Sequence, residues 1–164
     1  MEFESIGKFF GAAKSSQNNE FILIDSNEGS NKPSTLLVAT KESKELIYSY
    51  KLKYAASTAI SNQGHSAAIS FNYKNMDAVI SCIDPNGDLS FVKKSHSVPN
   101  CLAFDNECKF LVIAFAGEEQ YVECYSIVWI DIKSGMLIKA EQAPNLLPIF
   151  ELEFDDQNSL IIGN

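Results

Sequence analysis

From residue 20 onward, short runs of apolar residues take turns with polar, turn-rich segments, and LIYSYKL at residues 46–52 has apolar residues on alternate positions, the period of a β-strand. The runs FILID, TLLVAT and LIYSYKL, between residues 21 and 52, are rich in β-branched and aromatic residues. Glycine and proline lie almost wholly between such runs. No long helical stripe follows residue 20. The pattern therefore predicts an antiparallel all-β body over residues 20–164, and the length of 164 residues favours a single domain spanning 1–164.

The first eighteen residues follow a different pattern. Apolar side chains fall near helical spacing, with Glu and Lys between them, at Phe3, Ile6, Phe9, Phe10 and Ala13. This spacing predicts a short amphipathic helix within residues 1–18. An extra edge strand is the alternative.

The clearest local signal is a hairpin over residues 78–92. The runs AVISCI and LSFV flank the sequence DPNGD, in which Pro suits the first corner of a turn and Gly supplies a positive φ.

Internal similarity is present but irregular. Three segments align: AISFNYKNMDAVIS from Ala68, CLAFDNECKFLVIA from Cys101 and ELEFDDQNSLIIGN from Glu151. Each holds a Phe before a polar turn, and the Phe positions 71, 104 and 154 lie 33 and 50 residues apart. The segments that begin at His65 and His96 also start alike, as HSAAISF and HSVPNCLAF.

A run with the only tryptophan, YSIVWIDIKSGMLIKAE from Tyr125, follows the second of these segments. The first predicted strand of this run ends with Trp129-Ile-Asp131, and the turn sequence Lys-Ser-Gly leads into a second predicted strand. This arrangement resembles one unit of a WD-type β-propeller, and Gly64-His65 resembles the Gly-His that opens such units. The resemblance implies a propeller-like array of three to four irregular antiparallel units over residues 20–164. We expect Trp129 to be mostly buried, packed among strand residues such as Ile127 and Leu137. A two-sheet β-sandwich is the alternative fold.

Charge narrows the choice of partners. The chain has a net charge of −8 and no arginine. Residues 1–82 hold eight acidic and eight basic side chains, whereas residues 83–164 hold thirteen acidic and five basic ones. Nucleic-acid binding needs a basic face, so we do not expect it. An acidic half favours a protein partner with a basic surface, because such fields steer encounter; solubility alone is the other interpretation.

Motifs for catalysis and metal binding are absent from the sequence. The histidines, His65 and His96, lie far apart, and the propeller resemblance gives both a structural role, hydrogen-bonded within their units. Four cysteines form no C-x-x-C pair, so we expect buried free thiols rather than disulfides. We therefore expect no enzyme activity, no cofactor and no metal. Without an apolar run of roughly 20 residues or a secretory N-terminus, we expect a cytoplasmic protein with no membrane partner.

Acidic clusters are the candidate binding residues, with a solvated strand face as the alternative. Alternation places Glu151 and Glu153 on one strand face, opposite Phe150 and Leu152. We also expect residues 84–88 and 118–119 to occupy equivalent turns on one rim. The full candidate set is Asp84, Asp88, Glu118, Glu119, Glu123, Glu151, Glu153, Asp155 and Asp156.

The overall profile resembles the immunity proteins that bacteria pair with delivered toxins, as in contact-dependent growth inhibition. The profile is small, acidic, free of arginine and all-β. This resemblance implies a non-enzymatic protein that binds and neutralises a basic toxin of the nuclease type, and it assigns no individual residue. The alternative function is a propeller-like scaffold or peptide-binding domain.

Overall fold

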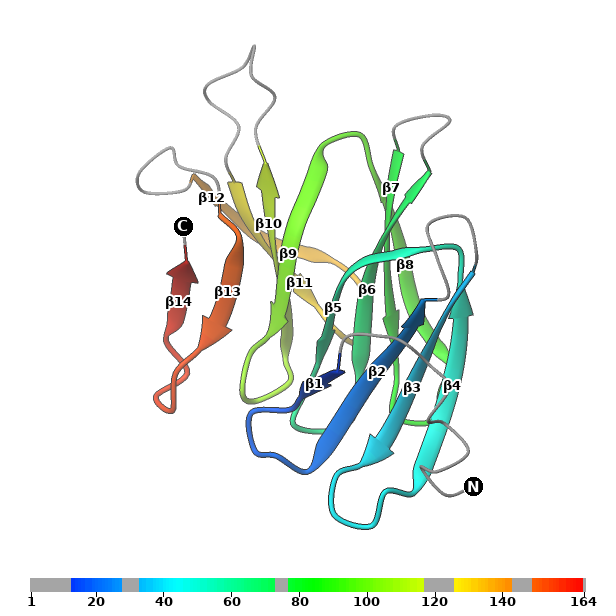
Figure 1. Cartoon of the computed structure of the whole chain (residues 1–164). Helices are drawn as coiled ribbons and strands as arrows, with labels where there is room; N and C mark the ends of the chain where they lie inside the picture. The colour runs from blue at the N-terminus through cyan, green and yellow to red at the C-terminus, as the bar shows by residue number, and fades with distance from the viewer. Residues whose placement is uncertain (1–12, 28–32, 73–76, 117–125, 143–148, 164) are drawn as a thin grey trace.

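The computed structural model describes residues 13–27, 33–72, 77–116, 126–142 and 149–163, and these hold strands but no helix. The strands form four antiparallel sheets, which we call units 1 to 4 in chain order (Figure 1). The all-β prediction is thus confirmed. Among the described residues, no helix of sufficient length and apolarity to cross a membrane occurs.

Three units have four strands each and the last has two. Unit 1 holds β1 (Ala13–Ser15), β2 (Phe21–Asn27), β3 (Ser34–Thr40) and β4 (Leu46–Leu52). Unit 2 holds β5 (Ala55–Ile60), β6 (Ser66–Asn72), β7 (Asp77–Ile83) and β8 (Leu89–Ser95). Unit 3 holds β9 (Val98–Phe104), β10 (Phe110–Ala116), β11 (Ser126–Asp131) and β12 (Leu137–Gln142). Unit 4 holds β13 (Glu151–Phe154) and β14 (Leu160–Gly163).

The apolar core lies between successive units. One cluster joins units 1 and 2 through side chains such as Leu36 and Ile83, which are fully buried. A second joins units 2 and 3 around Ile69 and Leu111, and a third joins units 3 and 4 around Val112 and Leu152. The sheets therefore pack face to face in series, as propeller blades do, rather than as the two layers of a sandwich.

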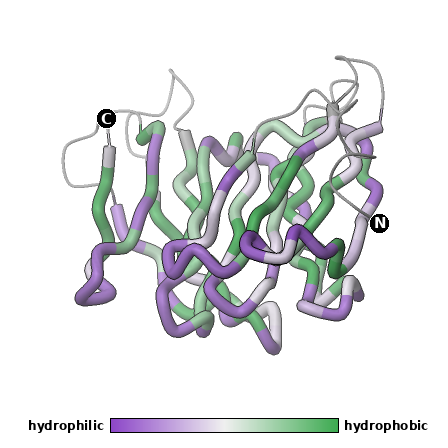
Figure 2. Tube along the Cα trace, turned by 60° about the horizontal axis from the view of Figure 1, so that its bottom comes forward, coloured by the Kyte–Doolittle hydropathy of each residue, from purple (hydrophilic) through white to green (hydrophobic). Residues whose placement is uncertain are grey.

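The first strands of the units lie together on the inside of this series. β1 contacts β5, β5 contacts β9, and β9 contacts β13. In Figure 1 these strands follow one another across the middle of the molecule, and the later strands of units 2 and 3 fan outward behind them. Figure 2 shows the hydrophilic hairpin turns gathered at one end, below strands that are largely hydrophobic.

The turn between the first and second strand repeats in all four units. These turns begin at residues 16, 61, 105 and 155 and have the same length. In each, the N–H of the fourth turn residue donates to the carbonyl of the first. The fourth residue has a positive φ in every case, at Asn19, Gly64, Cys108 and Asn158.

The turn between the third and fourth strand repeats in units 1 to 3. The strand register shifts at Val38/Ala39, Cys82/Ile83 and Trp129/Ile130, directly before each turn. Trp129-Ile-Asp131 therefore ends the third strand of its unit, as the propeller resemblance implies. Its structural equivalent in unit 2 is Cys82-Ile-Asp84.

This register corrects the predicted repeat. Phe104 and Phe154 end first strands, whereas Phe71 lies in a second strand, so its alignment with them is wrong. Gly64-His65 lies in the turn after the first strand and does not open unit 2, which begins with β5. The shared pattern misled the alignment because a Phe near the end of a strand, followed by polar residues, occurs in both first and second strands.

The N-terminal prediction is corrected where it can be checked. Ala13–Ser15 form an edge strand beside β2, so the predicted helix does not extend that far and the alternative of an edge strand holds there. The remaining residues of the predicted helix, 1–12, lie outside the described residues.

Trp129 is only partly buried, less than predicted. It packs with Ile127 in the cluster between units 3 and 4, but Leu137 is 60% exposed and does not cover it. Its neighbour on β12 is Lys139, whose ammonium group lies 3.9 Å from the centre of the indole ring. The prediction of Leu137 as a packing partner is therefore wrong, because this side chain lies on an exposed edge strand.

Candidate functional site

A central cavity of about 820 Å³ opens where the four first strands meet. β1, β5, β9 and β13 all contribute to its lining, and the turns at residues 17 and 106 reach its edge. The cavity is placed by the fold itself, because each unit contributes its innermost strand. It is the principal candidate site among the described residues.

Lys14 on β1 supplies a cationic group at this cavity. The Lys14 side chain is exposed as a whole, but its Nζ donates to the backbone carbonyl of Thr58 at 2.6 Å. Burial of the ammonium lowers the pKa of Lys14, and the nearby Cys101 and Glu151 oppose this shift. The hydrogen bond holds the lysine across the gap between units 1 and 2.

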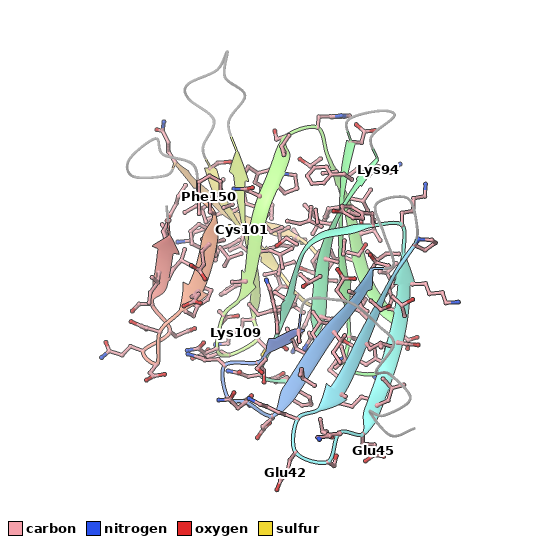
Figure 3. All side chains as sticks on the ribbon, in the orientation of Figure 1. Glu42, Glu45, Lys94, Cys101, Lys109 and Phe150 are labelled. Carbon is pink, nitrogen blue, oxygen red and sulfur yellow. The ribbon has the colours of Figure 1, made fainter. Side chains whose placement is uncertain are left out.

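β13 supplies the carboxylates of the cavity. Glu151 and Glu153 are exposed while Leu152 between them is buried, so the predicted alternation of this strand is confirmed. Phe150, predicted to lie with Leu152, is 66% exposed instead, because it precedes the strand. Figure 3 shows Phe150 near the upper end of β13, with Cys101 on the neighbouring β9. Three charged side chains line the cavity: Lys14, Glu151 and Glu153. The lining therefore holds one more carboxylate than ammonium group.

A circuit of amide side chains joins the turns at one end of the cavity. Asn18 N donates to Asn62 Oδ1 at 2.9 Å, which links units 1 and 2. Asn62 Nδ2 donates to the carbonyl of Asn106 at 3.5 Å, which links units 2 and 3. Asn106 Nδ2 donates to the carbonyl of Asp155 at 2.6 Å, and Gln17 Nε2 donates to that of Phe154 at 3.0 Å. The last bond connects unit 4 back to unit 1, so the inner ends of all four units are tied together.

The only described cysteine on this cavity is poorly suited to nucleophilic chemistry. Burial raises the pKa of Cys101 to about 11, although Lys14 acts to lower it. Cys101 Sγ lies 3.8 Å from the carbonyl of Ile149. A thiolate is the reactive form, and this environment disfavours it. Cys82, Cys101 and Cys108 are free and buried, as predicted for these three, and Cys124 lies outside the described residues.

The two histidines lie away from the cavity lining. The backbone N–H of His65 donates to Ser61 Oγ at 2.9 Å, and burial lowers the pKa of the His65 ring while Asp84 opposes the shift. His96 Nδ1 lies 2.9 Å from Asp77 Oδ1, although its side chain is 95% exposed. Both contacts are made with residues of unit 2, and the structural role expected for the two histidines stays a prediction. Within the described ranges, no three His, Cys, Asp or Glu side chains gather as metal ligands would.

Two of the predicted acidic residues cap turns. Asp84 Oδ1 accepts from the N–H groups of Asn86 and Asp88 at 2.8 and 2.9 Å. Desolvation acts to raise the pKa of Asp84, but these N–H donors outweigh it and the pKa is lowered. Asp155 Oδ1 accepts from Gln157 N and Ser159 N in the same way, at 2.9 and 2.8 Å. These carboxylates are therefore partly committed to their own turns, whereas Asp88 and Asp156 are exposed.

Contrary to expectation, the acidic candidates do not fall in equivalent connections of their units. Asp84 and Asp88 lie between the third and fourth strands of unit 2, whereas the segment with Glu118 and Glu119 connects the second and third strands of unit 3. In an antiparallel sheet, successive connections leave from opposite ends, so the two are not equivalent. Glu118, Glu119 and Glu123 themselves lie outside the described residues.

Sequence reasoning missed Lys14, Phe150 and Asn100 as parts of the site; Asn100 also lines the cavity, where its Nδ2 donates to the carbonyl of Ile149. Lys14 was assigned to the predicted helix, and the other two carry no motif. One signal was available: the polar turns that begin at 16, 61, 105 and 155 are 45, 44 and 50 residues apart. Taking the strand before each turn as the innermost would have placed all three residues near one axis.

Comparisons with solved structures support the architecture. Hydrazine synthase of Kuenenia stuttgartiensis superposes with a TM-score of 0.64 at 16% identity, covering 92% of this chain and 48% of that one. The β-propeller domain of the trilobed protease from Pyrococcus furiosus, which has an open velcro topology, gives a TM-score of 0.56 at 14% identity, covering 84% of this chain and 43% of that one. The fold is β-propeller-like.

A third similar structure is a eukaryotic initiation factor, with a TM-score of 0.59 at 14% identity over 80% of this chain and 32% of that one. The chain thus spans about half or less of the length of these structures. No protein-family model and no curated protein matches the sequence. At such low identity the likeness concerns the fold alone, since one fold hosts many functions.

Proposed function

We propose that the chain is a non-enzymatic, propeller-like scaffold that binds a protein partner at its central cavity. The observation that carries this proposal is the combination, at one concave site, of Glu151 and Glu153 with Phe150, an aromatic side chain that is 66% exposed. An exposed aromatic group beside charged groups is typical of a protein-binding surface.

The charge of the cavity selects the kind of partner. Lys14 Nζ already donates to the carbonyl of Thr58, and among the described residues neither Glu151 nor Glu153 forms an ion pair with it. A partner segment that carries a basic side chain next to an apolar one suits this arrangement. The apolar side chain would cover Phe150, and the basic one would approach the carboxylates.

Partner capture with matched variants tests this proposal. The protein is used as bait in extracts of its native cells, and captured proteins are identified by mass spectrometry. A Glu151→Lys/Glu153→Lys double variant should lose the specific partner, and Phe150→Ala should weaken its capture. Glu42→Lys/Glu45→Lys is the control, because these residues lie on the β3–β4 turn, far from Phe150 (Figure 3).

Binding kinetics with the purified partner complete the test. Association should slow as salt rises, since exposed charges are screened beyond about 8 Å at physiological ionic strength. The Glu151/Glu153 reversal should slow association more than the Glu42/Glu45 reversal. Equal sensitivity of both variants, or of neither, would contradict the proposal and leave the acidic composition as a contribution to solubility.

A narrower form of the proposal is an immunity function against a basic nuclease toxin. Its support is the charge distribution, because the whole net charge of −8 falls after residue 82. The propeller-like fold supports the scaffold function better than this narrower one. An adjacent reading frame for a large toxin, together with inhibition of that nuclease by the purified protein, would favour immunity. A partner without nuclease activity would contradict it.

A further inference from the structure

A second cavity, of about 340 Å³, lies between units 1 and 2 and shares no lining residue with the central one. Its walls come from the end of β4 and from β6, β7 and β8. In a chain of net charge −8, three lysines line this cavity against a single carboxylate: Lys51, Lys53 and Lys94 against Asp77.

Strand alternation shows which lysines serve the cavity. Tyr50 and Leu52 pack towards unit 2, so Lys51 between them projects to the opposite face. Lys94 pairs with Val79, a residue of the cavity lining, whereas Lys93 pairs with Ile80, which packs towards unit 3. Lys94 therefore supplies positive charge from β8, and Lys53, which follows the end of β4, adds a second ammonium group to the lining. Asp77 is held 2.9 Å from His96 Nδ1.

A buried hydroxyl group at this cavity lacks a partner. Ser70 is 7% exposed, and its Oγ has no hydrogen-bond partner among the described residues. Ile69 and Phe71 pack towards unit 3, so alternation directs Ser70 towards unit 1 and into the interface that holds the cavity. A buried hydroxyl without a hydrogen-bond partner is unfavourable, and a ligand oxygen at this position would supply the missing partner.

We propose that this cavity binds a small organic anion through its carboxylate or phosphate group. Lys94 and Lys53 attract the anionic group, and the Ser70 hydroxyl donates a hydrogen bond to one of its oxygens. Leu52 and Val79 form apolar walls for the rest of the ligand. The volume lies at the lower end of the range for small-molecule sites, about 300–1,000 Å³, which limits the ligand to a compact molecule.

Four probes separate the elements of this site by isothermal titration calorimetry. Inorganic phosphate carries the charge alone, phenyl phosphate and benzoate add an apolar body, and benzyl alcohol is the neutral counterpart. One of the two aromatic anions should bind at least ten-fold more tightly than inorganic phosphate, and the preferred one identifies the anionic group. Benzyl alcohol should show no binding. Failure of both aromatic anions to bind at millimolar concentration would overturn the proposal.

Variants locate the binding. Lys94→Gln should lower the affinity for the preferred anion at least ten-fold. Lys93→Gln, one residue along the same strand on its other face, should change this affinity less than two-fold. Ser70→Ala should weaken binding while leaving the melting temperature of the free protein unchanged or higher, because the lost hydroxyl has no partner to lose. Equal weakening of binding by the two lysine variants would mean that general surface charge causes the effect. A lower melting temperature of Ser70→Ala with unchanged affinity would mean that the serine has a structural role. Either result contradicts the proposal.

Discussion

At the residue scale, exposure changes what Trp129 contributes to stability. Its ring packs against the cluster between units 3 and 4, and the Lys139 ammonium group lies 3.9 Å from the ring centre. Truncation of a fully buried aromatic costs about 3–5 kcal/mol, and this ring is only partly buried. Trp129→Ala should therefore lower the free energy of unfolding by about 2 kcal/mol. Trp129→Phe should retain most of the free energy that is lost in Trp129→Ala. Urea unfolding followed by circular dichroism measures both, and a loss above 4 kcal/mol would mean that the ring is more enclosed than described.

Asp25 introduces a pH dependence at the same scale. Burial raises the pKa of Asp25, although a hydrogen bond from Ser34 opposes the shift, and its Oδ1 has no hydrogen-bond partner among the described residues. A carboxyl group whose pKa is raised on folding stabilises the fold at pH values below its unfolded pKa, and this contribution is lost as the pH rises through the folded pKa. Asp25→Asn should thus gain stability relative to the natural protein between pH 4 and pH 7.

The comparison is made by urea unfolding at several pH values. The difference between Asp25→Asn and the natural protein should grow towards neutral pH and shrink in acid. Asp88→Asn is the control, because this exposed carboxyl should alter stability by no more than about 0.5 kcal/mol at any pH. A difference that does not vary with pH would show that Asp25 ionises as easily in the fold as outside it.

At the scale of elements, close packing between turns and neighbouring units requires glycine. Gly87 has a φ of +89°, and a Cβ there would lie 2.8 Å from Cβ of Tyr48 on the outer strand of unit 1. Gly135 repeats this contact one unit later, against Phe91 of β8 at 3.0 Å. Gly87→Ala should lower the free energy of unfolding by about 2 kcal/mol, since backbone strain of about 1–2 kcal/mol is joined by overlap with Tyr48.

Gly64→Ala provides the matched control for this prediction. Gly64 also has a positive φ, +84°, but a Cβ there would meet Phe21 at 3.4 Å, an ordinary contact. In the same experiment, Gly64→Ala should lower the free energy of unfolding by about 1 kcal/mol, the part that comes from backbone strain alone. Equal losses at the two positions would show that contact with Tyr48 contributes nothing.

The sequence is informative about elements and less so about their register. Strand periodicity and the DPNGD turn predict most of the sheets, because burial of one strand face enforces alternation. The unit boundaries were misplaced because the similarity was judged on Phe71, Phe104 and Phe154. The sequences Cys-Ile-Asp at 82–84 and Trp-Ile-Asp at 129–131 mark truly equivalent strand ends. Their likeness is short, since side chains at equivalent positions meet different neighbours in each unit.

At the scale of the whole molecule, the central cavity depends on four inner strands that are distant in sequence. Four different units contribute residues to its lining: Lys14, Thr58, Cys101 and Glu151. No local sequence pattern predicts that these residues lie close together. Only the propeller-like resemblance placed such strands around one axis. The carboxylates of β13 were predicted from alternation, whereas Lys14 and Phe150 emerged only from the fold.

The amide circuit should decide how firmly unit 4 is held to the others. Unit 4 has two strands, and Asn106 Nδ2 ties its turn to unit 3 through the carbonyl of Asp155. Asn106→Ala removes this bond, worth about 1 kcal/mol, and so should favour local opening of unit 4. Amide hydrogen exchange followed by mass spectrometry should then be roughly five-fold faster over β13 and β14, with β5 to β8 unchanged.

Two further variants distinguish a lost tie between units from a general loss of stability. Asn158→Gly keeps a residue that accepts a positive φ but removes the Oδ1 that accepts from Asn106 N at 2.8 Å, so it should accelerate exchange in the same two strands. Glu107→Ala changes an exposed side chain of the same unit 3 turn and should leave exchange unaltered. If Asn106→Ala accelerates exchange in every unit, the amide circuit supports the molecule as one cooperative body. If exchange in β13 and β14 does not change, the apolar cluster around Leu152 holds unit 4 without the amide circuit.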